Sequence, residues 1–340
     1  MFLKNLIDIE TISELKKIIY KRVDFTFFII SVFILPISIK WSSKLLFIAL
    51  ALGIIRSIYK SDFSWFYKHR RIITCYIIFV SYIFLQGLFI EGYEVFFKKF
   101  DKAVAPYLVF ILVPVFFIEK EFVKIIPKVF IAGLFFLFLL ILCNSFLDSS
   151  FYSRERVLEV FDIHHLYASL YILFAINYIL SRLLKKQNIF NTTTSLICLV
   201  ILTVFLFIFK RKAAIVVYIV LLIFYAFKSL NLSRIKFLIV LSLGLVISLI
   251  FSKYLIDLYL DALNFRLKIW SAAVESFWKN PFTGYGTLNE YKTLNYQHFL
   301  NTDFAFLDSN FNSHNQYLTL LLKFGILGLV FFSLPFVFFF

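Results

Sequence analysis

The sequence is short of the residues that build soluble, disulfide-linked or metal-binding folds. Of its 340 residues, 3 are cysteine, 9 glycine and 6 proline, and charged residues make up 16%. A soluble domain is about 25% charged, so this low charge argues against an ordinary soluble domain. Cys75, Cys143 and Cys198 lie inside apolar runs, without a CxxC pair or a histidine nearby. They are therefore predicted to be packing residues and not disulfide or metal ligands.

Several motifs of energy-coupled and nucleotide-dependent proteins are also missing. The chain has no Walker loop, no GxGxxG after a strand, no HExxH and no Asp-x-Asp. These absences argue against a transport ATPase and against a cytosolic enzyme that uses nucleotide sugars. The first 23 residues carry acidic side chains and lack a small-residue cleavage site, so they are read as a cytoplasmic amphipathic segment and not as a signal peptide.

The sequence is instead rich in long apolar runs. It is 61% hydrophobic and 21% aromatic, with a mean hydropathy of +0.89. A helix needs about 20 apolar residues to cross a bilayer, so the runs predict an all-α polytopic membrane protein with about ten transmembrane helices. The predicted spans are 24–39, 44–58, 72–90, 104–118, 125–147, 164–181, 193–209, 213–227, 235–256 and 315–340. We expect one integral membrane domain over residues 1–340.

The net charge of +15 is interpreted as an indication of membrane topology and not of nucleic-acid binding. Of the 35 basic residues, 19 lie near the N-terminus and in segments such as 56–71 and 120–128, which the positive-inside rule assigns to the cytoplasm. The long segment 257–313 then lies outside, where long loops are exempt from the rule.

Three adjacent cations break this pattern. Lys210, Arg211 and Lys212 stand at a tight, outward-facing turn between two apolar spans. Charged residues at such a place indicate a functional site by default. The alternatives are that the three side chains extend to lipid head groups, or that two spans are miscounted.

The outer segment 257–313 begins with a predicted helix. Its apolar residues recur at helical spacing, which predicts a helix lying along the membrane surface: Phe265, Ile269, Ala273 and Phe277. Asn280-Pro281 ends this helix, and Gly284 and Gly286 permit a turn with positive φ.

A polar step then leads into the last apolar run. Ser313, His314 and Asn315 precede a run that is predicted to form one helix to the end of the chain. Ser313 is the expected helix cap. The role of His314 is either that of a second polar residue at the helix start or that of a catalytic base.

Four motifs in order resemble the O-antigen ligase and O-antigen polymerase superfamily of lipid-linked oligosaccharide glycan transferases. They are Arg266 with Trp270, then Pro281-Phe-Thr-Gly-Tyr-Gly286, then His314-Asn315-Gln-Tyr-Leu318, then Gly325-Ile-Leu-Gly-Leu329. Two upstream pieces are similar to further family features: the histidine-tyrosine step that starts at His164, and the outward turn at Lys210-Arg211-Lys212-Ala213. Lys323 departs from the family pattern, because an acidic residue is common at this place.

This resemblance implies transfer of a glycan from undecaprenyl pyrophosphate to an acceptor hydroxyl at the periplasmic face of the bacterial inner membrane. The acceptor would be lipid A core for a ligase, which we favour, or a growing glycan for a polymerase that joins repeat units. No cofactor, metal or nucleic acid is expected. A non-enzymatic transporter or flippase of lipid-linked sugars is the other alternative, and it predicts charges in the middle of several spans.

The resemblance also implies roles for individual residues. His314 is the candidate general base, since an unperturbed histidine pKa of about 6.5 suits proton abstraction near neutral pH. Arg211 and Arg266 are the candidates to bind the pyrophosphate, because guanidinium groups make bidentate phosphate contacts. Lys210, Lys212, Asn315 and His164 are secondary candidates.

Overall fold

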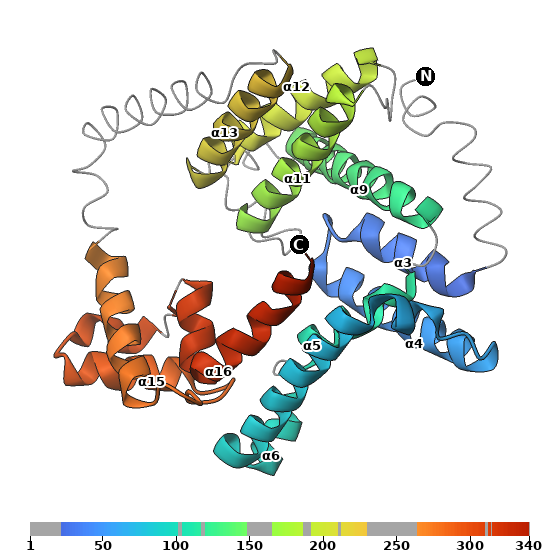
Figure 1. Ribbon diagram of the computed structural model, residues 1–340. Coiled ribbons are helices and arrows are strands. Elements are labelled where there is room, and N and C mark those ends of the chain that lie inside the picture. The colour runs from blue at the N-terminus through green and yellow to red at the C-terminus, as the bar shows by residue number, and fades with distance from the viewer. Residues whose placement is uncertain are drawn as a thin grey trace. The chain divides into compact units, whose positions relative to one another are not determined.

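The described part of the chain is helical. The computed structural model describes residues 22–100, 104–116, 120–147, 165–185, 192–209, 212–229, 264–309, 312–313 and 315–339, and these residues include no β-strand (Figure 1). This confirms the predicted all-α class. Internal contacts divide the chain into two compact units, which are described separately: Met1–Asp62 with Val115–Gly244, and Phe63–Pro114 with Leu245–Phe340.

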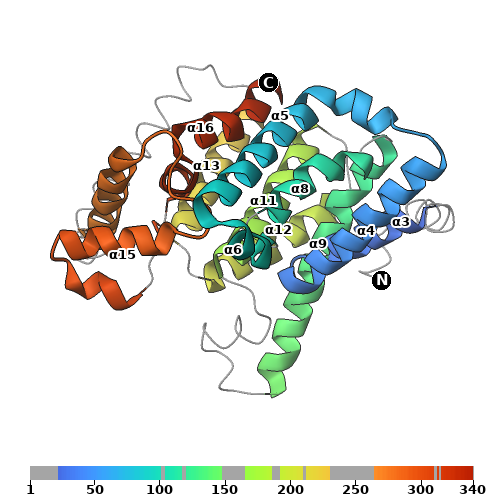
Figure 2. The same cartoon turned by 90° about the horizontal axis from the view of Figure 1, so that it is seen from below.

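The first unit is built from apolar helices that pack through their side chains. Its helices are α3 (Val23–Ile34), α4 (Ile39–Tyr59), α9 (Lys120–Leu147), α11 (His165–Leu184), α12 (Thr192–Ile208) and α13 (Lys212–Ser229). Helix α3 packs against α4 and α9, and α11 packs against α9, α12 and α13 (Figure 2). The stacked rings of Phe138 and Phe205, 3.7 Å apart, lie in the core that α9, α11, α12 and α13 share.

The second unit combines apolar helices with a polar region. It contains α5 (Ser64–Gln86), the π turn η1 (Gly87–Glu91), α6 (Tyr93–Lys98), α8 (Ala105–Leu112), a helix over residues 264–279, α15 (Glu290–Leu300), the 3₁₀ segment η4 (Phe304–Ser309) and α16 (Gln316–Phe339). The 3₁₀ turn η2 (Val113–Phe116) spans the boundary between the units. Helix α5 packs against both α8 and α16.

Apolar helices occur at the predicted places. Within the described residues five helices are long and apolar enough to cross a membrane: Ile39–Tyr59, Ser64–Glu91, Lys124–Asn144, Tyr167–Leu184 and Gln316–Val337. Shorter apolar helices cover Val23–Ile34, Tyr107–Phe116, Thr192–Ile208 and Ala214–Ser229. Helices suit the lipid phase because they satisfy every backbone hydrogen bond internally. The predicted span 235–256 lies outside the described residues, and the count of about ten spans stays a prediction.

One expectation for the second unit is wrong. Helix α16 is not continuous, since Gly325 has φ 65° and ψ −167° in its interior. The predicted helix is present over residues 264–279 and packs part of its apolar face against protein, while Phe265 is 36% exposed. Ile269 and Ala273 are fully buried, and Ala273 packs in a cluster with Leu294 of α15 and Leu322 of α16. The place of this helix along the membrane surface stays a prediction.

Candidate functional site

The PFTGYG loop, residues 281–286, is paired through its backbone with the break in α16. The amide of Tyr285 donates to the carbonyl of Leu322 (2.8 Å), and the amide of Gly286 donates to that of Lys323 (2.9 Å). In the other direction, the amide of Ile326 donates to the carbonyl of Pro281 (2.8 Å). The break frees helical carbonyl and amide groups, and the loop satisfies them, as buried backbone groups require.

Glycine is needed on both sides of this pairing. A Cβ atom on Gly325 would lie 2.2 Å from the carbonyl oxygen of Phe282, and one on Gly284 would lie 2.6 Å from that of Leu322. Both glycines also have positive φ, where other residues are strained. The two glycine motifs of the sequence are therefore halves of one backbone contact.

The end of α5 holds this contact from one side. The side-chain amide of Gln86 donates to the carbonyl of Lys323 (2.7 Å) and also contacts the carbonyl of Thr283. The Tyr82 hydroxyl donates to the carbonyl of Phe324 (2.7 Å). These bonds occupy carbonyl groups next to the break and fix the loop and α16 to α5.

A buried carboxylate organises the start of α16. Glu290, only 3% exposed, forms an ion pair with Lys323 (Oε2 to Nζ, 3.1 Å). Its Oε1 accepts a hydrogen bond from the Thr319 hydroxyl (2.9 Å) and one from the Ser313 amide (3.3 Å). The cation that departs from the family pattern thus has its carboxylate partner on α15.

The residues on both sides of His314 are held in place. The indole of Trp270 donates a hydrogen bond to the backbone carbonyl of Ser313 (3.0 Å). The side-chain hydroxyl of Ser313 forms a hydrogen bond with the Thr319 hydroxyl (2.6 Å). The Asn315 side chain accepts from the amides of Tyr317 (3.0 Å) and Leu318 (3.4 Å). Asn315 therefore caps α16, and the expectation that Ser313 does so is wrong.

The predicted site residues are described unequally. Arg266 is exposed on the 264–279 helix, and Asn315 is half-buried at the start of α16. Lys212 is the first residue of α13 in the other unit. The remaining candidates, His314, Arg211, Lys210 and His164, lie outside the described residues.

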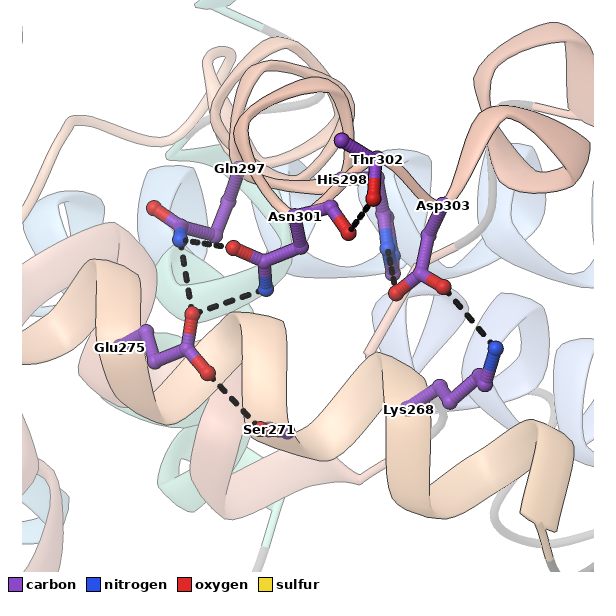
Figure 3. A network of polar contacts seen from close by, with 8 residues as sticks. All are labelled: Lys268, Ser271, Glu275, Gln297, His298, Asn301, Thr302 and Asp303. Atoms are coloured by element: carbon purple, nitrogen blue, oxygen red, sulfur yellow. Dashed lines mark hydrogen bonds and ion pairs between the residues drawn. The ribbon is translucent and has the colours of Figure 1, made fainter.

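A second polar network links the 264–279 helix with α15 and the turn after it (Figure 3). Glu275 accepts hydrogen bonds from Asn301 (2.8 Å), Gln297 (2.8 Å) and Ser271 (2.9 Å). The bond from Asn301 contributes most to lowering the pKa of the Glu275 carboxyl below its usual value. This carboxylate stays charged and joins the two helices.

His298 occupies the buried end of the same network. Its ring stacks on Phe306 at 4.7 Å, and neither ring nitrogen has a hydrogen-bond partner within the described part of the chain. Burial lowers the pKa of His298, while Asp303, 3.9 Å away and bound to Lys268, acts in the opposite direction. A neutral, enclosed imidazole cannot reach a substrate, so we read His298 as a packing residue.

Glu290 is the residue that sequence reasoning missed. It stands in LNEYKT, at the start of α15, where an acidic side chain is commonplace. The usable signal lay elsewhere: Lys323 is a cation within an apolar run, and such a cation needs a partner. Nothing in the spacing says which of the acidic residues that partner is. Within the described residues, no group of three His, Cys, Asp or Glu side chains could hold a metal ion.

Comparison with known protein families gives a match to part of the chain. Residues 191–333 match the family model described as O-antigen ligase. No curated protein and no solved structure matches the chain. The match confirms the resemblance to the O-antigen ligase superfamily, and it covers residues 210–213, the 264–279 helix, the PFTGYG loop and most of α16.

Proposed function

We propose that this protein transfers a glycan from undecaprenyl pyrophosphate to an acceptor hydroxyl at the periplasmic face of the bacterial inner membrane, as an O-antigen ligase does. The match of residues 191–333 supports glycan transfer of the ligase or polymerase type. The observation that carries the site is the set of bonds around Ser313 and Asn315, which hold the backbone on either side of His314.

In the proposed reaction His314 takes the proton of the acceptor hydroxyl. The hydroxyl oxygen attacks the anomeric carbon of the donor, and the bond from that carbon to the pyrophosphate oxygen breaks. Negative charge then grows on the leaving pyrophosphate, which Arg211 and Arg266 would stabilise. The exposed position of Arg266 supports this role, since a residue that binds a substrate must be accessible.

Transfer assays on purified protein test this mechanism. The donor is an undecaprenyl-pyrophosphate glycan, and wild type is compared with His314→Ala, Arg266→Ala and the matched control Arg71→Ala, an exposed arginine of α5. Loss of a general base typically lowers the rate by about 10²–10⁴-fold. Loss of a group that stabilises developing charge lowers it by about 10²–10³-fold. Wild-type rates in the first two variants would refute the site, and a wild type without transfer would refute the function.

The acceptor distinguishes a ligase from a polymerase. A ligase transfers the glycan to a lipid A core, and a polymerase extends a second lipid-linked repeat unit. Movement of the donor across a vesicle membrane without any transfer would instead favour the transporter.

A further inference from the structure

A cavity in the second unit has no role in the mechanism above. Its volume is about 510 Å³, and its lining residues come from the end of the 264–279 helix, the PFTGYG loop and α15, together with Ile90. Ligand pockets are typically about 300–1,000 Å³, so this cavity has room for a sugar unit.

Basic, aromatic and amide residues line the cavity. They include Lys279 and Lys292, Tyr285 and Tyr296, and Asn289. None of the described residues that line it is acidic. Aromatic faces suit the C–H face of a sugar ring, amides and hydroxyls suit its hydroxyl groups, and the two lysines suit an anion.

Two polar lining groups stand out because the described part of the chain gives them no hydrogen-bond partner. The Ser276 hydroxyl is buried, with 1% of the residue exposed, and has no hydrogen-bond partner in the described part of the chain. A buried polar group without a partner is unfavourable, and a ligand hydroxyl would supply one. Lys292 is exposed, and the structure gives it no ion pair or hydrogen bond among the described residues.

Three of the lining residues are held by hydrogen bonds within the protein. The Tyr285 hydroxyl donates to the carbonyl of Ser276 (2.9 Å), and Asn289 donates to the carbonyl of Tyr285 (2.8 Å). Lys279 donates to the side chain of Gln297 (2.6 Å). Gln297 in turn donates to Glu275 in the network of Figure 3. A rigid site binds with a smaller loss of conformational freedom.

We propose that this cavity binds an acidic sugar unit, one that carries a carboxylate, of the glycan that the protein handles. The inference rests on the proposed function for the presence of a glycan, and it adds the chemical class. A lysine ammonium is a compact point charge on a flexible stem, and it can pair with a single carboxylate of a sugar. The tyrosine rings and amides favour a sugar over a bare pyrophosphate.

Binding measurements on the full-length protein in lipid nanodiscs test the proposal without requiring catalysis. The probes are a tetramer of galacturonic acid, the neutral maltotetraose, and inorganic pyrophosphate as a competitor. Wild type is compared with Lys292→Gln, the double variant Lys279→Gln/Lys292→Gln, Tyr296→Ala and Lys292→Arg. The matched control is Lys98→Gln, an exposed lysine of α6 in the same unit.

We expect the acidic tetramer to bind more tightly than the neutral one, and to bind more weakly as salt rises. The double variant should bind it about tenfold more weakly, a loss of about 1.4 kcal/mol. Lys292→Arg and Lys98→Gln should bind the acidic tetramer as wild type does. That result would show that the affinity depends on a positive charge at this place and not on a change in folding. Equal affinity for the two tetramers, no binding of either, full affinity in the double variant, or displacement by pyrophosphate would each overturn the proposal.

The same variants separate this proposal from the proposed function. If wild type binds the acidic tetramer through the two lysines but transfers no glycan, the cavity stands and the function fails. If transfer proceeds while the tetramer is not bound, the reverse holds. When both succeed, a KM raised by Lys292→Gln for one substrate assigns the cavity to the donor or to the acceptor.

Discussion

Two carboxylates are equally buried in the two units, yet their partners differ. Asp24 of α3 and Glu290 of α15 are each 3% exposed. Asp24 is bound by two arginines, Arg22 at 3.0 Å and Arg56 at 3.1 Å. Glu290 has one lysine, one hydroxyl and one backbone amide, all from the polypeptide between Ser313 and Lys323.

This difference separates an ion cluster that stabilises helix packing from one that positions a segment of the proposed site. The Asp24 cluster joins α4 to the chain at the start of α3, so its effect is on packing. Glu290 holds a short polar segment that carries the proposed base, and two of its three partners are neutral groups. A carboxylate that holds a loop by neutral donors sets the position of that loop more than it stabilises the fold.

The largest expected loss of stability follows from Asp24→Asn. The substitution takes the shared carboxylate from two mostly buried guanidinium groups, and breaking a buried pair in this way costs about 3–5 kcal/mol. Thermal unfolding in detergent measures the loss, with the exposed Glu94→Gln of α6 as the control. Transfer per folded molecule should be unchanged. A variant as stable as the control would contradict the structural role given to the Asp24 cluster.

Gly325→Ala tests the backbone contact on which the Glu290 segment rests. We expect a loss of about 3 kcal/mol, because strain at positive φ adds to a clash with the carbonyl of Phe282. Gly92→Ala is the matched control, since Gly92 has φ 77° but no atom within 4 Å of an added Cβ. It should lose about 1–2 kcal/mol from strain alone. Equal unfolding midpoints for the two variants would contradict the role given to the crowding.

Glu290→Gln should affect catalysis more than folding. We expect about 1–3 kcal/mol of lost stability and a fall in kcat of about 10²-fold, because small displacements of a catalytic group are costly. KM for the donor should change little.

A charge swap sharpens this test. Glu290→Lys combined with Lys323→Glu re-forms the pair with an acid at 323, the residue type that is common there in the resembled superfamily. The double variant should recover part of the rate lost by each single variant. A purely structural pair would recover the unfolding midpoint but leave kcat as low as in the single variants.

The smallest expected effect is a pH dependence from His298. Burial lowers its pKa, so below about pH 6.5 the unfolded chain binds a proton that the folded one does not. Its contribution to stability is therefore complete above that pH and is lost as the pH falls toward the lowered pKa. His298→Phe should reduce the fall in unfolding midpoint between pH 7.5 and 5.5 by a few degrees. An unchanged fall would show that other groups cause it.

The local features of the site followed from sequence where a single residue decides them. Asn280-Pro281 does end the 264–279 helix, and Gly284 and Gly286 do have positive φ. The apolar runs do form helices, because lipid leaves the backbone few other options. The break at Gly325 was missed because a glycine inside an apolar run reads as an ordinary helix position.

The cap of α16 was assigned to the wrong residue for a related reason. Ser313 and Asn315 are both good cap residues, and the sequence does not say which is free for the task. In the structure Ser313 is engaged by Trp270, Glu290 and Thr319, which leaves the cap to Asn315.

The sequence by itself determined the helical membrane class, the helix ends at proline and the turns at glycine, because these depend on solvent and on local backbone geometry. The order of the motifs also determined the resemblance to O-antigen ligases. Only the tertiary structure decided that two glycine motifs form one contact, that Lys323 pairs with Glu290, and that Ile269 and Ala273 of the 264–279 helix are buried. These are contacts between segments distant in the chain, and residue spacing carries no record of which buried groups satisfy one another.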